Sequence, residues 1–306
     1  MQKPRNNQAI ILKGVGGQYL LHRYDPFFKE IAVPRGIFRK KEETPLPGDL
    51  IEYSASGDPD IPYVIDKILP RKNQLIRPPM ANLDILLITV SLDLPKADYF
   101  LIDRLLSYAV LSKIKPFLIF TKYDLISNQE IDNKNSLSEL MANYTPTNFP
   151  IFVLGNDHDD DLKKLQTKIK NQVVAFAGQS GVGKSTLINR LFDKNIMLTD
   201  NLSEKAGRGK QTTRHIELFP YCNSYLADTP GFQAISLADM NLDPQVFANS
   251  YPELNELSKD CQFNNCTHRH EPKCAVLAAD SKKIHPDRLK RYNLLRKEIE
   301  AGNRKY

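Results

Sequence analysis

The sequence predicts a multidomain protein with an N-terminal β-barrel of the OB-fold type, a central α/β domain and a C-terminal α-helical segment. The first part of the chain consists of short apolar stretches separated by turn residues. From Asp84 onward, apolar strands alternate with amphipathic helices, which is typical of a mostly parallel sheet covered by helices. Beyond Gly231 the chain becomes polar and helical. We place the three parts at residues 1–78, 79–235 and 236–306.

The N-terminal part is expected to form a small barrel because it contains five short strands and no clear helix. Glycine and proline residues break it into pieces, and the stretch at 70–79 is proline-rich and suits an exit linker. The expected strands are 9–13, 18–24, 30–33, 49–53 and 63–68. Aromatic residues lie among basic ones here, so this part could stack bases and neutralise phosphates, or the aromatics could form its core. The aromatic residues are Tyr19, Tyr24, Phe27, Phe28 and Phe38, and the basic residues are Lys29, Arg35, Arg39, Lys40 and Lys41.

The central part is expected to alternate between strands and helices, with two successive strands at its end. The strands are predicted at 84–91, 116–121, 150–154, 172–177, 215–219 and 224–228. The helices are predicted at 97–114, 128–143, 161–169 and 184–192, and a basic helix at 288–301 ends the chain.

Composition favours a cytoplasmic globular protein. The chain has 306 residues, of which 41% are hydrophobic and 25% are charged. Its longest apolar stretches are strand-length, too short to cross a membrane, and its N-terminus lacks the apolar core of a secretion signal. The net charge of +6 is concentrated toward the two ends, which suits contact with a polyanion, although solvated basic surfaces are an alternative.

A phosphate loop follows the strand expected at 172–177 and precedes the helix expected at 184–192. It matches the pattern Gly-x4-Gly-Lys-Ser, in which glycines let backbone N–H groups wrap the phosphates. Lys184 is expected to reach the β- and γ-phosphates and to act in catalysis, and the Ser185 hydroxyl is expected to bind Mg²⁺. The expected nucleotide-contacting residues are Gly178, Gln179, Ser180, Gly181, Val182, Gly183, Lys184, Ser185 and Thr186.

Two further motifs end apolar strands, at the edge where α/β sheets bind ligands. In the segment Asp-Thr-Pro-Gly, the carboxylate of Asp228 is expected to order the Mg²⁺ shell through water, and the N–H of Gly231 to meet the γ-phosphate. In the segment Thr-Lys-Tyr-Asp, the carboxylate of Asp124 offers two acceptors to the paired donors of guanine, which adenine lacks. Thr121 and Lys122 complete this base site, for which a surface turn is the alternative interpretation. The expected ligand is therefore GTP.

The order of these motifs is unusual. In most GTPases the Thr-Lys-x-Asp type of motif follows the phosphate loop and the Asp-x-x-Gly motif, whereas here it precedes both. The central domain is therefore expected to be a circularly permuted P-loop GTPase.

The glycine-containing loop between the phosphate loop and Asp228 is expected to sense the γ-phosphate. A threonine in this loop should bind Mg²⁺, and we favour Thr213 over Thr212. Phe232 stands where many GTPases carry a glutamine that orients the attacking water. Slow hydrolysis by the isolated protein is therefore expected.

Three cysteines and a histidine indicate a structural metal site in the C-terminal segment. Cys261, Cys266, His268 and Cys274 lie within fourteen residues and supply the ligand set of a closed, tetrahedral Zn²⁺ site. His270 is a competing ligand, and three reduced, unliganded cysteines are the alternative. A closed site leaves no position for a reactive water, so this zinc is not expected to catalyse a reaction.

Taken together, the motifs resemble the ribosome small-subunit-dependent GTPase A family over nearly the whole chain. The runs TKYD, GQSGVGKST, GRGKQTT, DTPGF and CxxxxCxHxxxxxC follow that family's order. The resemblance implies a GTP hydrolase that binds the 30S subunit and its 16S rRNA, is stimulated by the subunit and acts in its late maturation. Family members often carry a histidine before the paired threonines, where this chain has Gln211, which can orient a water but is a poor base. The family's Ser-Ala loop at the guanine is replaced here by Leu154-Gly155-Asn156.

The leading hypothesis is a monomeric, GTP-driven RNA-binding switch that uses GTP, Mg²⁺ and Zn²⁺. The permutation places the Asp-Thr-Pro-Gly motif about thirty residues before the first zinc ligand, so a change at the γ-phosphate could move the helical segment. The alternative is an RNA-binding assembly scaffold in which GTP is only a structural ligand.

Overall fold

The computed structural model describes residues 7–40, 43–76, 78–126, 137–155, 159–192, 216–228, 232, 235, 237, 240 and 242–303. The chain divides into two compact units. One comprises residues 1–86, 164–176 and 185–232, and the other comprises residues 87–163, 177–184 and 233–306.

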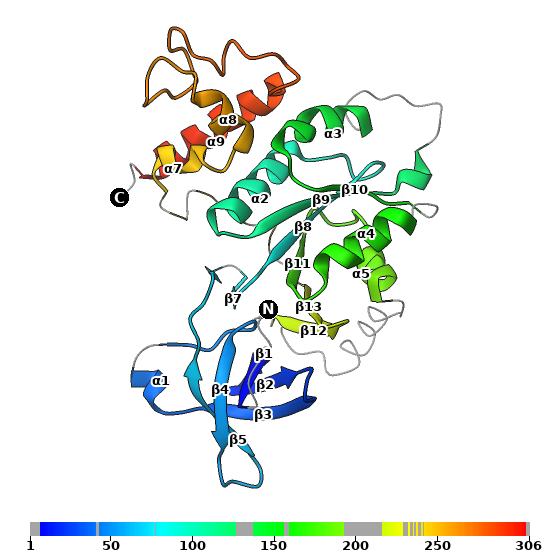
Figure 1. The fold of residues 1–306 in the computed structure, drawn as a ribbon, viewed down its shortest axis with the longest axis vertical. Coiled ribbons are helices and arrows are strands. Elements are labelled where there is room, and N and C mark those ends of the chain that lie inside the picture. Colours follow the sequence, from blue (N-terminus) through cyan, green and yellow to red (C-terminus); the bar gives the residue numbers. More distant parts are fainter. Residues whose placement is uncertain are drawn as a thin grey trace. The chain divides into compact units, whose positions relative to one another are not determined.

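The first five strands close into a barrel in the order β1-β2-β3-β5-β4, drawn in blue shades in Figure 1. Their bounds are Gln8–Val15, Gln18–Arg23, Phe28–Pro34, Leu50–Ala55 and Tyr63–Ile68 for β1 to β5. The barrel is filled by small and branched apolar side chains, among them Ala9, Ile11, Leu21, Ile51 and Ile65, each 0% exposed. A short helix, α1 (Ile37–Lys40), adds Phe38 to this core. The expected N-terminal barrel is confirmed.

Most of the aromatic residues considered for base stacking have structural roles in the barrel. Phe38 is 5% exposed in the core, and Phe28 stacks on Tyr53 at a ring-centroid distance of 4.6 Å. Tyr24 donates its hydroxyl hydrogen to the carbonyl of Ser224 (2.7 Å). Phe27, in contrast, is 73% exposed. The aromatic surface is therefore smaller than the sequence suggested, because burial within a barrel depends on strand pairing.

The central sheet has six strands in the order β10-β9-β8-β11-β13-β12. The pairs β9–β10 and β11–β13 are parallel, and β12–β13 is an antiparallel hairpin. All seven residues of β8 and all five of β11 are buried, which explains their continuous apolar sequences. The bounds are Ile85–Ser91 for β8, Lys115–Thr121 for β9, Ile151–Val153 for β10, Val173–Ala177 for β11, Glu217–Tyr221 for β12 and Ser224–Asp228 for β13.

The helices that follow these strands agree in type with those expected from the sequence. They are α2 (Tyr99–Leu111), α3 (Leu137–Tyr144), α4 (Asp159–Ile169) and α5 (Lys184–Phe192), with 3₁₀ turns η1 (Tyr123–Leu125) and η2 (Thr145–Thr147) and the short strands β6 (Gln74–Leu75) and β7 (Met80–Ala81). Asp98 caps α2, because its carboxylate accepts a hydrogen bond from the backbone N–H of Leu101 (3.0 Å). The part of the expected helix at 128–136 lies outside the described residues.

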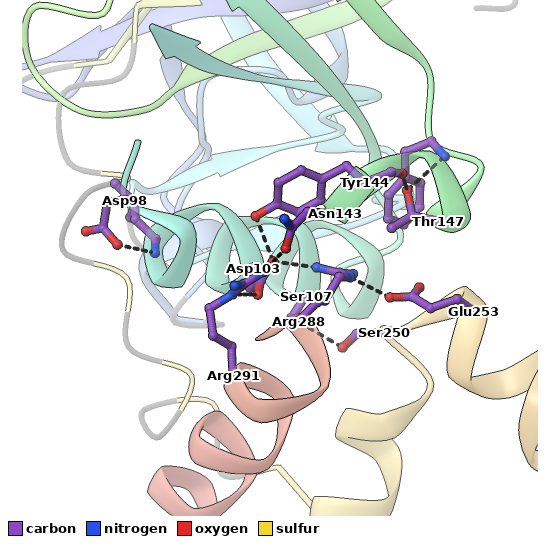
Figure 2. Close-up of polar contacts among 12 residues, drawn as sticks. Asp98, Asp103, Ser107, Asn143, Tyr144, Thr147, Ser250, Glu253, Arg288 and Arg291 are labelled. Carbon is purple, nitrogen blue, oxygen red and sulfur yellow. Dashed lines mark hydrogen bonds and ion pairs between the residues drawn. The ribbon is translucent and has the colours of Figure 1, made fainter. Parts of the chain in front are cut away.

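The C-terminal segment contains α7 (Pro244–Ala248), α8 (Pro252–Ser258) and α9 (Pro286–Asn303), and buried ion pairs attach it to α2. Figure 2 shows Asp103 of α2 facing Arg288 and Arg291 of α9. Arg288 also donates to Glu253 of α8 (2.5 Å), and Tyr144 donates its hydroxyl hydrogen to Asp103 (3.0 Å). The positive charges of two guanidinium groups and the negative charges of two carboxylates thus balance one another in this buried contact. Among the described helices, none has the length and apolarity that crossing a membrane requires.

Candidate nucleotide site and metal centre

The phosphate loop occupies the turn between β11 and α5, and its first glycine is required by a close approach of two backbones. Gly178 has φ of +136°, and a Cβ atom there would lie 2.2 Å from the carbonyl oxygen of Thr89 in β8. Gly181 and Gly183 also have positive φ values, of 78° and 93°. These conformations turn the chain sharply before α5, as wrapping a phosphate requires.

Lys184 lies at the first position of α5 and points back into the loop. Its ammonium group donates to the carbonyl oxygens of Gly178 (2.9 Å) and Gln179 (2.6 Å). The positive charge is therefore held at the loop itself, beside the first turn of a helix, where anions are also favoured by the helix dipole. Ser180, Ser185 and Thr186 are exposed at the same turn.

Thr121 connects the Thr-Lys-Tyr-Asp motif to the phosphate loop. It is the last residue of β9 and is 5% exposed. Its hydroxyl donates to the carbonyl oxygen of Val182 (2.6 Å), and the carbonyl oxygen of Val90 lies 3.2 Å from the same hydroxyl. Two motifs that are 61 residues apart in the sequence therefore share one buried hydrogen bond.

Asp124 is exposed in the 3₁₀ turn η1, directly after β9. Lys122, which precedes it, has a left-handed backbone (φ 63°) and donates from its ammonium group to the carbonyl oxygen of Leu94. Gly155 lies against Asp124, since a Cβ atom there would be 2.9 Å from the Asp124 nitrogen and 3.1 Å from its Oδ1. The sequence alone gave Gly155 no role of its own, although the segment Leu154-Gly155-Asn156 stands where the resembling family carries its Ser-Ala loop at the guanine.

Several sequence-predicted residues are not placed. Gln211, Thr212, Thr213 and Gly231 lie outside the described residues, and Asp228 is described only as the last backbone position of β13. Phe232 is 1% exposed, so this residue packs its ring in the interior.

The predicted metal ligands converge in the C-terminal segment. The three thiol sulfurs and the Nδ1 atom of His268 all lie within 4.8 Å of one another. The Sγ atom of Cys274 is 3.9 Å from that of Cys261 and 3.4 Å from Nδ1 of His268, which in turn is 3.8 Å from Sγ of Cys261. A tetrahedral zinc with the usual bond lengths needs about 3.8 Å between two sulfurs and about 3.6 Å between sulfur and nitrogen. The donor set therefore fits zinc.

The structure groups His268, and not the exposed His270, with the three thiols. Burial lowers the pKa of His268, while the neighbouring Glu271 opposes this shift. The net effect favours the neutral imidazole, which is the form that binds a metal.

Glu271 organises the ligand loop, a role that sequence analysis missed. Its carboxylate accepts hydrogen bonds from the backbone N–H groups of Thr267 (2.7 Å), Arg269 (2.8 Å) and His270 (3.1 Å). Burial acts to raise the pKa of Glu271, but these hydrogen bonds and one from the Thr267 hydroxyl outweigh it and lower the pKa. The loop is thereby shaped on both sides of His268, which has a left-handed backbone (φ 60°).

Sequence comparison relates the chain to a group of permuted GTPases. Residues 68–238 match the RsgA GTPase family. The small ribosomal subunit biogenesis GTPase RsgA of Shouchella clausii is 37% identical over 300 residues, which cover 98% of this chain and 99% of that protein. The protein of the same name from Bacillus subtilis is 35% identical over 287 residues, with 93% of each chain covered.

Structural comparison agrees over the whole fold. YjeQ from Thermotoga maritima superposes with a TM-score of 0.79 at 25% identity, covering 96% of this chain and 98% of that one. YloQ, described as a circularly permuted GTPase, superposes with a TM-score of 0.77 at 29% identity, covering 98% of this chain and 97% of that one.

Proposed function

Because this chain belongs to the RsgA GTPase family and is a GTP-hydrolysing enzyme, we propose that it acts in the late maturation of the 30S ribosomal subunit. The names of its relatives support the ribosomal role. In this proposal the protein is a cytoplasmic monomer that contacts 16S rRNA, and its turnover is stimulated by the subunit. The observation that carries the nucleotide part is the hydrogen bond from Thr121 to Val182, which links the base-reading segment to the phosphate loop.

The proposed roles in GTP binding follow from the chemistry of each group. Asp124 accepts the paired N–H donors of guanine, and the aliphatic stem of Lys122 lies along the base or ribose. Backbone N–H groups of residues 178–186 hold the phosphates, and Lys184 neutralises charge on the β- and γ-phosphates. The N–H of Gly231 contacts the γ-phosphate, and the loss of this phosphate on hydrolysis triggers the conformational change.

Mg²⁺ is the cation that this set of residues would hold. Ser185 and Thr213 supply hydroxyl oxygens, and Asp228 supplies a carboxylate that acts through water, which is the hard oxygen donor set that Mg²⁺ prefers. Bound there, the ion neutralises charge that develops on the phosphate oxygens. Gln211 orients the attacking water through its side-chain amide.

Zinc is the proposed occupant of the Cys261, Cys266, His268 and Cys274 cluster, and its role there is structural. The support is the agreement of the sulfur and nitrogen separations with a closed tetrahedral site. A loop with few apolar residues gains order from such a metal.

The test of the proposed function is GTP turnover with and without purified 30S subunits. We expect the wild-type protein to be slow alone and faster with the subunit, and Gln211→Ala to lower the stimulated rate by at least about tenfold. Gln211→His is the matched variant, because histidine can also orient water and should retain stimulated activity. Absence of stimulation in the wild-type protein would favour the alternative, an RNA-binding scaffold with GTP as a structural ligand.

The base assignment is tested separately by Asp124→Asn. An amide presents a donor to one of guanine's N–H groups, so affinity for GTP should fall while affinity for the xanthine nucleotide rises. Undiminished GTP binding by this variant would show that Asp124 does not read the base.

A further inference from the structure

A cavity of about 370 Å³ lies beside the metal cluster, in the C-terminal segment. Its walls come from α7, α8, the loop that precedes Cys266, and α9. Its distinguishing feature is a set of amide side chains from three of these elements, and we call it the amide pocket. The amides are Gln245, Asn249, Asn255, Asn264 and Asn265.

The walls of the amide pocket are held in place by contacts of their own. Asp243 caps α7 by accepting from the backbone N–H of Gln245 (2.7 Å), and the amide of Asn255 donates to the carbonyl of Asn249 (3.1 Å). The N–H of Cys266 donates to the carbonyl of Phe263 (3.2 Å), which closes the loop next to the metal ligands. A ligand would therefore enter a largely formed site and would have to order little of the chain.

Phe263 and Val246 add apolar surface to this polar pocket. Phe263 is 41% exposed and Val246 is 44% exposed, and both line the cavity. An exposed aromatic ring beside amide groups can stack on a flat ligand whose edge forms hydrogen bonds.

The charges around the pocket argue against a phosphate as its occupant. Among the described residues of its lining, Asp243 and Arg296 carry the charged side chains, and Cys266 and His268 of the metal cluster also belong to the lining. Arg296 is 5% exposed, and its guanidinium is already bound to the hydroxyl of Tyr292 (3.0 Å) and to Glu300 (3.2 Å). The interior is thus nearly neutral, and its recognition groups are amides that both donate and accept.

We propose that the amide pocket binds one unpaired nucleobase of the small-subunit RNA, with its ring on Phe263 and its edge on the amides. An apolar side chain from a protein partner would displace water from the amides of Gln245, Asn264 and Asn265 without offering them hydrogen bonds, which disfavours an apolar peptide ligand. A nucleobase offers both a stacking face and a mixed donor and acceptor edge. Lys273 is exposed, and its carbonyl oxygen accepts a hydrogen bond from the N–H of Gln262 (3.4 Å), which places it near the loop. Its ammonium group would contact a phosphate of the RNA backbone. This inference rests on the proposed ribosomal function.

The test compares binding of full-length variants to 30S subunits and to protein-free 16S RNA. Phe263→Ala should weaken binding to both by about 5- to 150-fold, the range that loss of one base–aromatic stack produces. Phe263→Tyr should bind like the wild-type protein, because tyrosine keeps the ring. Leu277→Ala is the matched control, since Leu277 is an equally exposed apolar residue (44%) of the same segment and does not line the cavity.

Ultraviolet crosslinking of the wild-type protein to 30S subunits identifies the ligand class. We expect a crosslink between the peptide that contains Phe263 and an unpaired nucleotide. The proposal would be overturned if Phe263→Ala bound as tightly as the wild-type protein. It would also be overturned if the variant bound 30S subunits more weakly but bound protein-free RNA normally, because that result would point to a ribosomal protein as the ligand. Zinc content and GTP turnover without subunits should be the same in Phe263→Ala as in the wild-type protein, and this result would show that the variant is folded.

If the wild-type protein itself fails to bind 30S subunits, the proposed function is wrong, and the proposal for the amide pocket is wrong with it.

Discussion

Thr121 links the Thr-Lys-Tyr-Asp motif to the phosphate loop through one buried hydrogen bond. A hydroxyl has one hydrogen to donate, and here it goes to a buried backbone carbonyl of the phosphate loop. Removing the donor while keeping the shape leaves that carbonyl unsatisfied, which is more costly than losing the hydrogen bond alone.

Thr121→Val should therefore lower the free energy of unfolding by about 1–3 kcal/mol and weaken GDP binding. Thr121→Ser keeps the hydroxyl and is the matched control, with a smaller loss of stability. Denaturant unfolding and calorimetric titration with GDP measure the two effects. Wild-type stability and affinity in Thr121→Val would contradict the role assigned to this hydroxyl.

The four cysteines differ in their surroundings, and the difference predicts which of them affect metal content. Cys266→Ser should reduce bound zinc from one ion per chain and expose the ligand loop, because serine is a poor zinc ligand. Cys222→Ser is the control, since Cys222 is exposed and lies outside the cluster. Elemental analysis of the purified variants gives the ratio, and equal zinc content in the two variants would exclude the cluster as the binding site.

At the scale of elements, helix α2 joins the phosphate loop to the C-terminal segment. The side chain of Gln179 accepts from the N–H of Asp98, the capping residue of α2 (3.2 Å). Farther along the same helix, Asp103 contacts α9 and Ser107 contacts Ser250, as Figure 2 shows. The helical segment is thus tied to the nucleotide site through α2, whereas sequence order suggested only the connection from the Asp-Thr-Pro-Gly motif.

The ion pairs of α9 allow a test within one helix. Arg288→Ala should lower the free energy of unfolding by about 3–5 kcal/mol, because it leaves the carboxylate of Glu253 buried without its counter-charge and Asp103 with Arg291 alone. Lys290→Ala removes an exposed pair with Asp287 and should change stability by less than about 1 kcal/mol. Thermal or chemical unfolding of both variants measures the difference, and similar losses would show that the buried network adds nothing.

The contact of β2 with β13 predicts a pH dependence of stability. Nδ1 of His22 lies 3.0 Å from the hydroxyl of Tyr225, and burial, followed by the charge of Lys29, lowers the pKa of His22 from 6.5 to about 4. His22 therefore binds a proton more readily in the unfolded chain than in the folded chain. The contribution of neutral His22 to the free energy of unfolding is complete above pH 6.5 and is lost as the pH falls toward 4.

Wild-type protein should therefore lose roughly 3 kcal/mol more stability than His22→Phe between pH 6.5 and 4, since phenylalanine does not titrate. Unfolding free energies of both proteins across this range give the difference curve, which removes the contribution of all other acid-sensitive groups. Parallel curves would mean that His22 titrates normally in the folded protein.

At the scale of the whole molecule, the permutation keeps the usual site while changing which parts flank it. The barrel precedes strand β9, which ends in the Thr-Lys-Tyr-Asp motif, and the segment with the cysteine and histidine cluster follows β13, so each end of the GTPase region continues into a different part of the chain. The sequence is basic at both ends. Arg288, Arg291 and Arg296 are buried in ion pairs, but Lys282, Lys283, Lys290 and Lys297 are exposed, which suits contact with a polyanion.

Affinity for 30S subunits should accordingly fall by at least about tenfold between roughly 50 and 200 mM salt, because each Lys or Arg contact with phosphate releases counterions. Filter binding or light scattering at several salt concentrations gives the slope. A flat profile would rule out RNA as the main contact, while leaving GTP binding untouched.

The sequence alone determined the local features of this protein. The expected strand at 63–68 and helix at 184–192 coincide with β5 and α5, and the expected terminal helix at 288–301 lies within α9. The motifs point to GTP and to Zn²⁺ as ligands, because a phosphate loop and a compact zinc loop are encoded by neighbouring residues, and both ligands stay predictions.

Only the tertiary structure decided which distant groups meet. Thr121 bonds to Val182 across 61 residues, Arg288 pairs with Asp103 across 185, and Phe28 and Phe38 pack into the barrel instead of forming a binding surface. No periodicity or spacing encodes such partners, because the contacts arise only when strands pair and helices pack. Burial then settles whether a given charge or ring serves stability or recognition.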